Sequence, residues 1–200
     1  AHDRCDGPGE GEHDVGVTGL ALLALLGDGN TTRDGAHSES VSRGLQWLRT
    51  QQDPDSGLFG ERLGHSYMYG HAIATLTVCE AYYFSKNPIL KSTAQRAVNF
   101  ISRARNPYGV WRYNSPPDGD QDTSVTGWMV LALRSAKDAG LKVDSAAFSD
   151  ALAWINEATD PNTGRVGYDS PGTASSRVRG VNDHFPTDRT ECMTAVGLLS

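Results

Sequence analysis

Two kinds of helical pattern alternate along the chain. In the first kind, apolar residues form one stripe with i, i+4 and i+7 spacing, as at Val41, Leu45 and Leu48, and the other positions are polar. This spacing is typical of a helix that buries a single face. The second kind, such as "VTGLALLALL" from Val17, is apolar around nearly its whole circumference. A helix of that kind must be buried on several sides, so the sequence predicts inner helices wrapped by outer ones.

Both patterns recur at a fixed interval. Trp47, Phe100 and Trp154 mark the outer pattern at intervals of 53 and 54 residues. The inner pattern "DVGVTGLALLAL" from Asp14 returns 108 residues later as "DTSVTGWMVLAL" from Asp122. "GHAIATLTVCEAY" lies between these two copies, and "TECMTAVGLLS" begins a fourth near the end. A period of this length with two helices per unit predicts an all-α solenoid of helical hairpins, about three and a half repeats long.

The repeats also suggest how the chain is divided. A polar lead-in over residues 1–12 is followed by a single α/α repeat domain over residues 13–200. Asp14 and Asp122 each precede an inner pattern and are predicted helix N-caps. The expected repeat boundaries are about 13–60, 66–113 and 120–168, with a partial copy at 189–200.

Composition narrows the class of partner. The 200-residue chain is 38% hydrophobic and 21% charged, with a formal net charge of −6, as in a globular protein. Its basic residues are scattered, so we expect no nucleic-acid partner. Its longest apolar run is too short to span a bilayer, so we expect no membrane span. Its three cysteines form neither a disulfide framework nor a zinc finger motif. Nothing in the sequence fixes a cellular compartment.

The outer pattern and the turn after it resemble a known motif. "RGLQWL" from Arg43, followed by Gln52 and Gly57-x-Phe59, resembles the QW repeat of squalene and oxidosqualene cyclases. "RAVNFI" with Gly109-x-Trp111 is a second copy, and "ALAWI" with Gly164 is a degenerate third. The chain thus resembles the terpene cyclase and protein prenyltransferase superfamily. It is most similar to uncharacterised bacterial proteins with prenyltransferase and squalene oxidase repeats.

That resemblance implies an α/α toroid. A closed toroid usually needs more hairpins than this chain contains, so we expect an incomplete, open toroid. The resemblance also implies that each QW segment ties the end of an outer helix to the next inner helix by stacking and hydrogen bonds. The motif therefore indicates an architecture and performs no chemistry itself.

A ligand site is expected along one rim. The links from outer to inner helices are long, rich in aromatic and polar residues, and all reach the same edge of the solenoid. Long loops and helix N-termini on a rigid scaffold favour a binding site. Residues 169–188, rich in Gly, Ser and Arg, are either a ligand loop or a tolerated insertion. The candidate ligand-binding residues are Tyr69, His71, Trp111, Tyr113, Asp122 and Trp128.

The resemblance raises one catalytic possibility. Class II terpene cyclases protonate an alkene with an acid in an Asp-x-Asp-Asp-Thr-Ala segment. Here the segment is "GDQDTSV", in which Asp122 matches the last acid, while Gly119 and Gln121 occupy the other two acid positions. We therefore favour a helix cap at Asp122 over a proton donor. The candidate catalytic residues are Asp122, His71 and Glu191.

A zinc site is a further possibility implied by the resemblance. Protein prenyltransferases bind zinc with Asp, Cys and His residues at the starts of inner helices. The candidate ligands here are Asp14, His71, Asp122 and Cys192, but the chain has no Asp-x-Cys pair before an inner helix. We therefore expect helix caps and a hydrogen-bonded histidine, with no bound metal or cofactor.

Intact scaffold motifs beside incomplete catalytic motifs favour a binding module. It would hold a protein, a peptide or an apolar ligand on its concave face or its loop rim. The alternative is an isoprenoid-type enzyme, either terpene cyclase-like or prenyltransferase-like, with an acid or a metal at the inner-helix N-termini. The unpaired apolar helix from Glu191 onward also suggests a homodimer.

Overall fold

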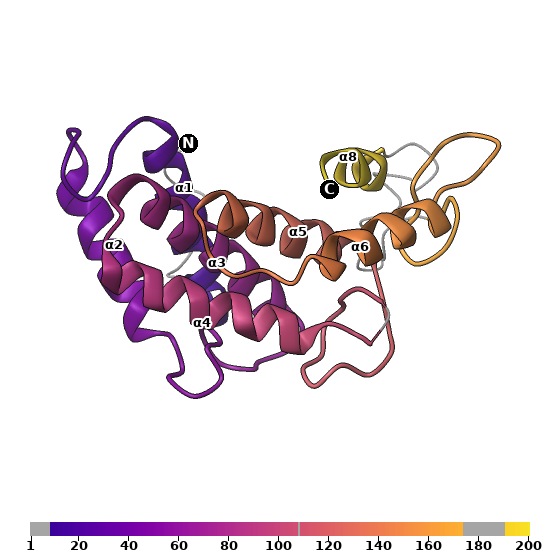
Figure 1. Ribbon diagram of the computed structural model, residues 1–200, viewed down its shortest axis with the longest axis horizontal. Coiled ribbons are helices and arrows are strands. Elements are labelled where there is room, and N and C mark those ends of the chain that lie inside the picture. The colour runs from indigo at the N-terminus through magenta and orange to yellow at the C-terminus, as the bar shows by residue number, and fades with distance from the viewer. Residues whose placement is uncertain (1–8, 108, 174–190) are drawn as a thin grey trace.

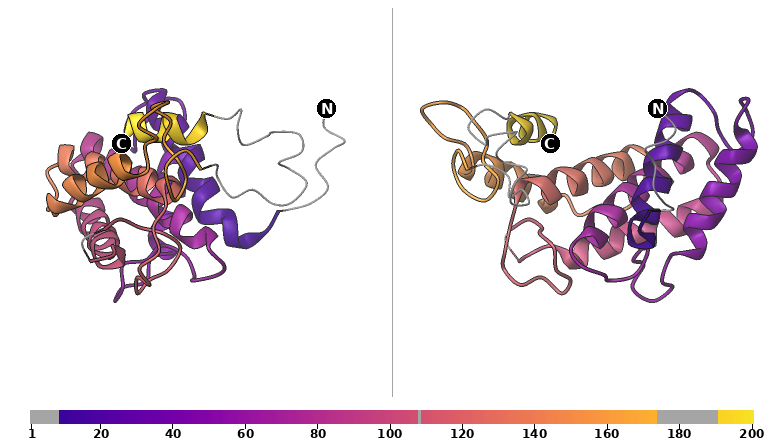
Figure 2. Two further views of the ribbon diagram at one scale, coloured as in Figure 1. Left: turned by 90° about the vertical axis from the view of Figure 1, so that its right-hand side faces the viewer. Right: turned by 180° about the vertical axis from the view of Figure 1, so that it is seen from behind.

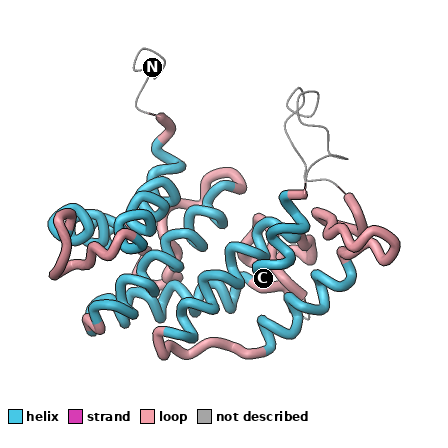
Figure 3. Tube along the Cα trace, turned by 90° about the horizontal axis from the view of Figure 1, so that it is seen from above, coloured by secondary structure: helices cyan, strands magenta, loops and turns pink. Residues whose placement is uncertain are grey.

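The chain forms helices in the order that the sequence predicts. The structure, a computed structural model, describes residues 9–107, 109–173 and 191–200. Within these ranges it is all-helical, with two isolated β-bridges and no named strand (Figures 1 and 3). The elements are η2 (Gly11–His13), α1 (Asp14–Gly27), α2 (Ser38–Thr50), α3 (Ser66–Ser85), α4 (Pro88–Ala104), α5 (Thr123–Asp138), α6 (Ala146–Glu157) and α8 (Cys192–Leu199).

The helices are arranged in two layers. In the inner layer α1 packs against α3, α3 against α5, and α5 against α8. The outer helices α2, α4 and α6 pack against α1, α3 and α5 respectively, which gives a row of helical hairpins (Figures 1 and 2). The predicted outer stripe is buried, since Val41 and Leu48 are both 0% exposed. The expected all-α, α/α-toroid class is confirmed.

Glycines allow the inner helices to approach one another closely. A Cβ at Gly19 of α1 would lie 2.9 Å from Cγ2 of Ile73 in α3. A Cβ at Gly127 of α5 would overlap the side chain of Val196 in α8. Glycine costs about 1 kcal/mol relative to alanine inside a helix. That cost is offset here by close helix–helix contact.

Gln52 links the first QW segment to the following hairpin. Its side-chain Nε2 donates to the carbonyl oxygens of Gly57 at 3.1 Å and Thr93 at 3.0 Å. Its Oε1 accepts from Nη2 of Arg96 at 2.6 Å. Thr93 and Arg96 belong to α4, so this tie runs to the next outer helix, whereas the QW resemblance implied a tie to the next inner helix.

A different hydrogen bond connects each turn to the next inner helix. The residue two places after the turn glycine donates its backbone N–H to a side chain on that helix. Phe59 donates to Nδ1 of His71 in α3 at 3.1 Å, Trp111 to Oγ1 of Thr126 in α5 at 3.5 Å, and Val166 to Oγ1 of Thr194 in α8 at 3.2 Å. We call these three bonds the turn–helix tethers. They identify His71, Thr126 and Thr194 as equivalent positions.

One predicted helix cap is wrong. Asp14 is the first residue of α1 rather than its cap, because residues 11–13 form a 3-10 turn that precedes the helix. The N-cap of α1 is His13, which makes no side-chain capping bond. The backbone N–H of Asp14 donates to the carbonyl of Gly11 in this turn, so the chain is already helical before Asp14.

Replacing Gln52 by alanine is expected to destabilise the protein by about 1–3 kcal/mol, because the buried partners of its amide lose their hydrogen bonds. The neighbouring Gln51 is a matched control, since within the described part of the chain its side chain bonds the exposed Thr50 hydroxyl alone. Gln51→Ala should change stability by less than about 0.5 kcal/mol. Urea unfolding of both variants measures this difference, and equal losses would contradict the role of Gln52.

Candidate functional site

Asp122 begins the inner helix α5 and is completely buried. Its Oδ1 accepts a hydrogen bond from the backbone N–H of Val125 at 2.8 Å, so the predicted N-cap is confirmed. Its own N–H donates to the carbonyl of Trp111 at 3.1 Å. The next residue, Thr123, donates its N–H to the carbonyl of Tyr168 at 2.9 Å. Two rim segments distant in sequence therefore meet at the start of α5.

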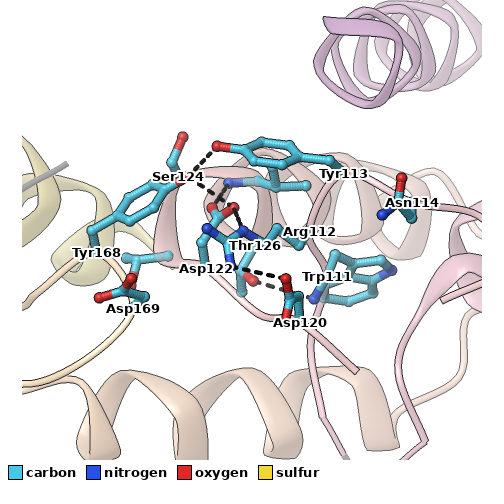
Figure 4. A network of polar contacts seen from close by, with 12 residues as sticks. Trp111, Arg112, Tyr113, Asn114, Asp120, Asp122, Ser124, Thr126, Tyr168 and Asp169 are labelled. Carbon is cyan, nitrogen blue, oxygen red and sulfur yellow. Dashed lines mark hydrogen bonds and ion pairs between the residues drawn. The ribbon is translucent and has the colours of Figure 1, made fainter. Parts of the chain in front are cut away.

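The second carboxylate oxygen of Asp122 faces an arginine and a tyrosine. The Tyr168 hydroxyl donates to Oδ2 at 3.2 Å, and Nε of Arg112 lies 3.7 Å from the same oxygen (Figure 4). Arg112 also pairs with the exposed Asp120 at 3.3 Å. Burial raises the pKa of Asp122 to about 6, against the opposing effects of the Val125 N–H, the Tyr168 hydroxyl and Arg112. The Asp122 carboxyl group therefore titrates close to neutral pH.

Tyrosine side chains from three segments surround this buried acid. The Tyr113 and Tyr168 hydroxyls hydrogen-bond to each other (Figure 4). The Tyr69 hydroxyl of α3 hydrogen-bonds to Oγ of Ser124 at 2.7 Å, and burial raises the pKa of Tyr69. The rings of Tyr69 and Tyr113 lie 6.2 Å apart between centroids. The structure thus brings together three of the predicted ligand residues, namely Tyr69, Tyr113 and Asp122.

Two further residues predicted to bind ligand, Trp111 and Trp128, are not part of this tyrosine cluster. Trp111 is 0% exposed, and its indole N–H donates to the carbonyl of Ile101 at 2.8 Å. Its side chain belongs to the core and is out of reach of a ligand at the rim. Trp128 is half-buried on α5 and lines a surface cleft.

His71 is a structural residue in this fold. Its ring is completely buried, with Nδ1 accepting from Phe59 N–H. Nε2 lies 3.2 Å from the carbonyl of Ala97, which can only accept, so the ring proton sits on Nε2. Burial lowers the pKa of His71 to about 3, and the Ala97 carbonyl opposes this shift only weakly. With both nitrogens engaged, a metal or a substrate could bind only by breaking the tether or the hydrogen bond to the Ala97 carbonyl.

The remaining candidate ligands and catalytic residues are spread along the solenoid. Asp14 and Cys192 are exposed at the starts of α1 and α8. Glu191 is exposed and pairs with Arg165 at 3.1 Å. Within the described ranges, the one group with ligating atoms in mutual reach is Glu10, Glu12 and His13, all exposed. The four predicted metal ligands do not form such a group among the described residues.

An apolar cleft lies between α5 and α8. It has a volume of about 230 Å³, with Gly127, Trp128 and Leu131 on one side and Val196 and Leu199 on the other. The hydroxyls of Ser124 and Ser200 are its polar groups. Ser124 also bonds Tyr69, so the cleft adjoins the tyrosine cluster. The predicted ligand loop, residues 169–188, lies mostly outside the described residues.

Sequence reasoning missed Arg112 and the α8 side of the cleft. "WRY" at Trp111 follows a turn, and side chains alternate in an extended segment. That alternation could have indicated that Arg112 points opposite to the buried Trp111. The α8 residues carried no such signal, since their pattern resembles that of every other inner helix.

The alternating layers and the glycine-lined inner helices define an α/α-toroid protein. The chain belongs to the squalene-hopene cyclase C-terminal domain family, whose model matches residues 11–175. It is therefore a terpene cyclase-like helical domain. Neither a curated protein nor a solved structure gave a match. In the part of the chain that the structure describes, no helix has the length and apolar character needed to cross a membrane.

Acidification should destabilise the fold through His71. Its folded pKa, about 3, lies below its unfolded value of about 6.5, so the unfolded state binds the proton first as pH falls. Stability is therefore complete above pH 6.5 and falls by up to about 1.4 kcal/mol per pH unit below it. In His71→Thr, the residue type of the equivalent positions, this decline should disappear. Unfolding free energies between pH 7.5 and 4.5 measure it, and an unchanged slope in the variant would contradict the assignment.

Asp122 should have the opposite effect. Its folded pKa, about 6, lies above its unfolded value of 3.8, so the folded state takes up the proton first as pH falls. This group therefore stabilises the fold on acidification from about pH 7 to pH 4, by about 1–3 kcal/mol. Asp122→Asn keeps the capping oxygen but cannot titrate, so it should lose more stability than the wild type on acidification. The same pH series measures this, and parallel curves would refute it.

Proposed function

We propose that this chain is a binding module for a compact apolar ligand, held in the cleft between α5 and α8. One observation carries the proposal: two apolar walls face each other across the cleft. Trp128 and Leu131 form one wall, and Val196 and Leu199 form the other. An apolar cavity of about 150 Å³ holds benzene. A cleft of about 230 Å³ therefore suits a bicyclic ring or a short branched hydrocarbon.

The polar groups beside the cleft favour a ligand with one hydroxyl. Ser124 is half-buried and shares its hydroxyl with Tyr69. A ligand hydroxyl at this position could donate to Ser124 or accept from it, because a serine hydroxyl does both. Among the described residues, the cleft lining carries no ionised side chain, so a charged ligand would lose its hydration without compensation there.

Substituting Trp128 by alanine should weaken binding of 2-naphthol, a bicyclic alcohol used here as the probe, by about tenfold. The reason is the loss of aromatic contact with the probe. A tenfold weaker affinity corresponds to a loss of about 1.4 kcal/mol in binding free energy. Trp47→Ala is the matched control, since Trp47 is also half-buried but lies away from the cleft. Titration followed by calorimetry measures both affinities. Equal affinities for Trp128→Ala and wild type, or an equal loss in Trp47→Ala, would contradict the proposal.

A second candidate function is acid-catalysed cyclisation of a polyene, which the raised pKa of Asp122 favours. In that reaction the carboxyl proton would pass to an alkene carbon, and the cation would later lose a proton or capture water. Two observations weigh against it. Asp122 has no exposed surface and both its oxygens have partners, and Arg112 beside it favours the carboxylate.

Incubation with squalene, followed by mass spectrometry of the extracted lipids, tests the enzyme hypothesis. Under our proposal neither wild type nor Asp122→Asn yields a cyclised product. A product formed by the wild type and lost in Asp122→Asn would establish the second candidate. The variant keeps the capping oxygen, and a circular dichroism spectrum equal to that of the wild type would show that a loss of product does not come from misfolding.

A further inference from the structure

A groove on the outer layer lies between the end of α2 and the start of α4. It has a volume of about 410 Å³. Arg49 from the last turn of α2 lines one part of it, and the rest of the lining belongs to α4, namely Pro88, Ile89, Ser92, Thr93 and Arg96. Among the described residues, this lining contains two guanidinium groups and no carboxylate. We call this feature the arginine groove.

Arg96 is held in a fixed position by neutral acceptors. Its Nε and Nη2 donate to Oε1 of Gln52, at 3.1 and 2.6 Å, and its Nη1 donates to Oγ of Ser92 at 2.9 Å. Nη1 and Nη2 each carry a second hydrogen, so both have a further bond to offer. Arg105, just after the same helix, pairs instead with Asp144 at 2.9 Å. Within the described ranges the charge of Arg96 has no such partner.

Arg49 and Ser92 bring further donors to the groove. Arg49 is exposed, and its guanidinium makes no ion pair or hydrogen bond with any described residue. Arg43, on the same helix, lies 3.9 Å from Glu39. The Ser92 hydroxyl accepts from Arg96, and no described group accepts its own proton. The groove therefore collects N–H and O–H donors that have charge and direction but no acceptor.

The start of α4 adds to the positive potential. This helix contains no acidic residue, and Asn87 caps it with a neutral side chain that accepts from the N–H of Ile89 at 2.9 Å. A helix N-terminus carries about half a positive charge and favours anions. The whole chain has a net charge of −6, so an excess of positive charge at one groove is a local property. These groups together suit an oxyanion.

We propose that the arginine groove binds the phosphate group of a phosphate monoester. Such a group carries a charge of about −1.5 to −2 at neutral pH and three acceptor oxygens. It can therefore balance both guanidinium groups and still accept from Ser92, whereas a carboxylate has one charge and two oxygens. Arginine binds phosphate oxygens through parallel N–H bonds. Ile89, 52% exposed in the same lining, offers apolar contact to the organic part of the ester.

This proposal is independent of the apolar ligand proposed above. The arginine groove lies between outer helices, whereas the apolar cleft lies between the inner helices α5 and α8. The two sites share no lining residue. Failure of one therefore leaves the other untouched.

Calorimetric titration with phenyl phosphate, in a buffer without phosphate, tests the groove. The wild type should bind the probe, and Arg49→Gln should bind it about tenfold more weakly, because hydrogen bonds to a charged group are lost. Arg43→Gln is the matched control: it removes an exposed arginine of the same helix outside the groove and should leave the affinity unchanged. Equal affinities for Arg49→Gln and the wild type, or an equal loss in Arg43→Gln, would overturn the proposal.

A second probe tests the charge of the ligand. Phenyl sulfate has nearly the same shape as phenyl phosphate but a single negative charge, so it should bind about tenfold more weakly. Equal affinities for the two probes would contradict recognition of a phosphate monoester. Thermal unfolding should give the same midpoint for wild type, Arg49→Gln and Arg43→Gln, since both arginines are exposed.

Vesicles distinguish the two sources of such a phosphate. Phosphatidylcholine vesicles with and without phosphatidic acid present a lipid headgroup that is itself a phosphate monoester. Sedimentation with phosphatidic acid vesicles alone, lost in Arg49→Gln, would support the proposal and assign the group to a lipid. Binding of phenyl phosphate without vesicle binding would support it and assign the group to a soluble ester. Binding of neither would overturn the proposal.

Discussion

The fold depends on one repeated contact, the bond from a turn N–H to a side chain of the next inner helix. An unsatisfied buried N–H costs about 1–3 kcal/mol. Each turn must therefore find an acceptor, and the inner helix must present one at a fixed height. His71, Thr126 and Thr194 provide that acceptor in three successive helices. The tether thus sets the register in which the inner helices pack.

This constraint explains why a histidine on the loop rim performs no evident chemistry. His71 has the residue type of a ligand or a base, yet it takes the position that threonine takes in the other two tethers. A neutral imidazole serves there because it can accept from Phe59 and donate to Ala97 at once. The chemistry-bearing cluster is instead at Asp122, one helical turn before Thr126 on α5.

The tether also relates the buried acid to the apolar cleft. It holds α5 so that its start gathers Asp122, Arg112 and Tyr168, while the middle of the same helix presents Trp128 to the cleft.

The sequence by itself determined the helices, their alternation and the class of fold. These follow from apolar periodicity, which is a local property, and from the QW spacing. It also located the Asp122 cap, because aspartate is a preferred N-cap residue before an apolar helical run. The same rule failed at Asp14, where a 3-10 turn precedes the helix. Only the tertiary structure decided which rim residues meet: it joined Tyr69, Tyr113 and Tyr168 near Asp122, and it placed Trp111 and His71 in the core. The physical reason is that burial and pKa depend on neighbours from other hairpins, and a periodic sequence does not specify these neighbours.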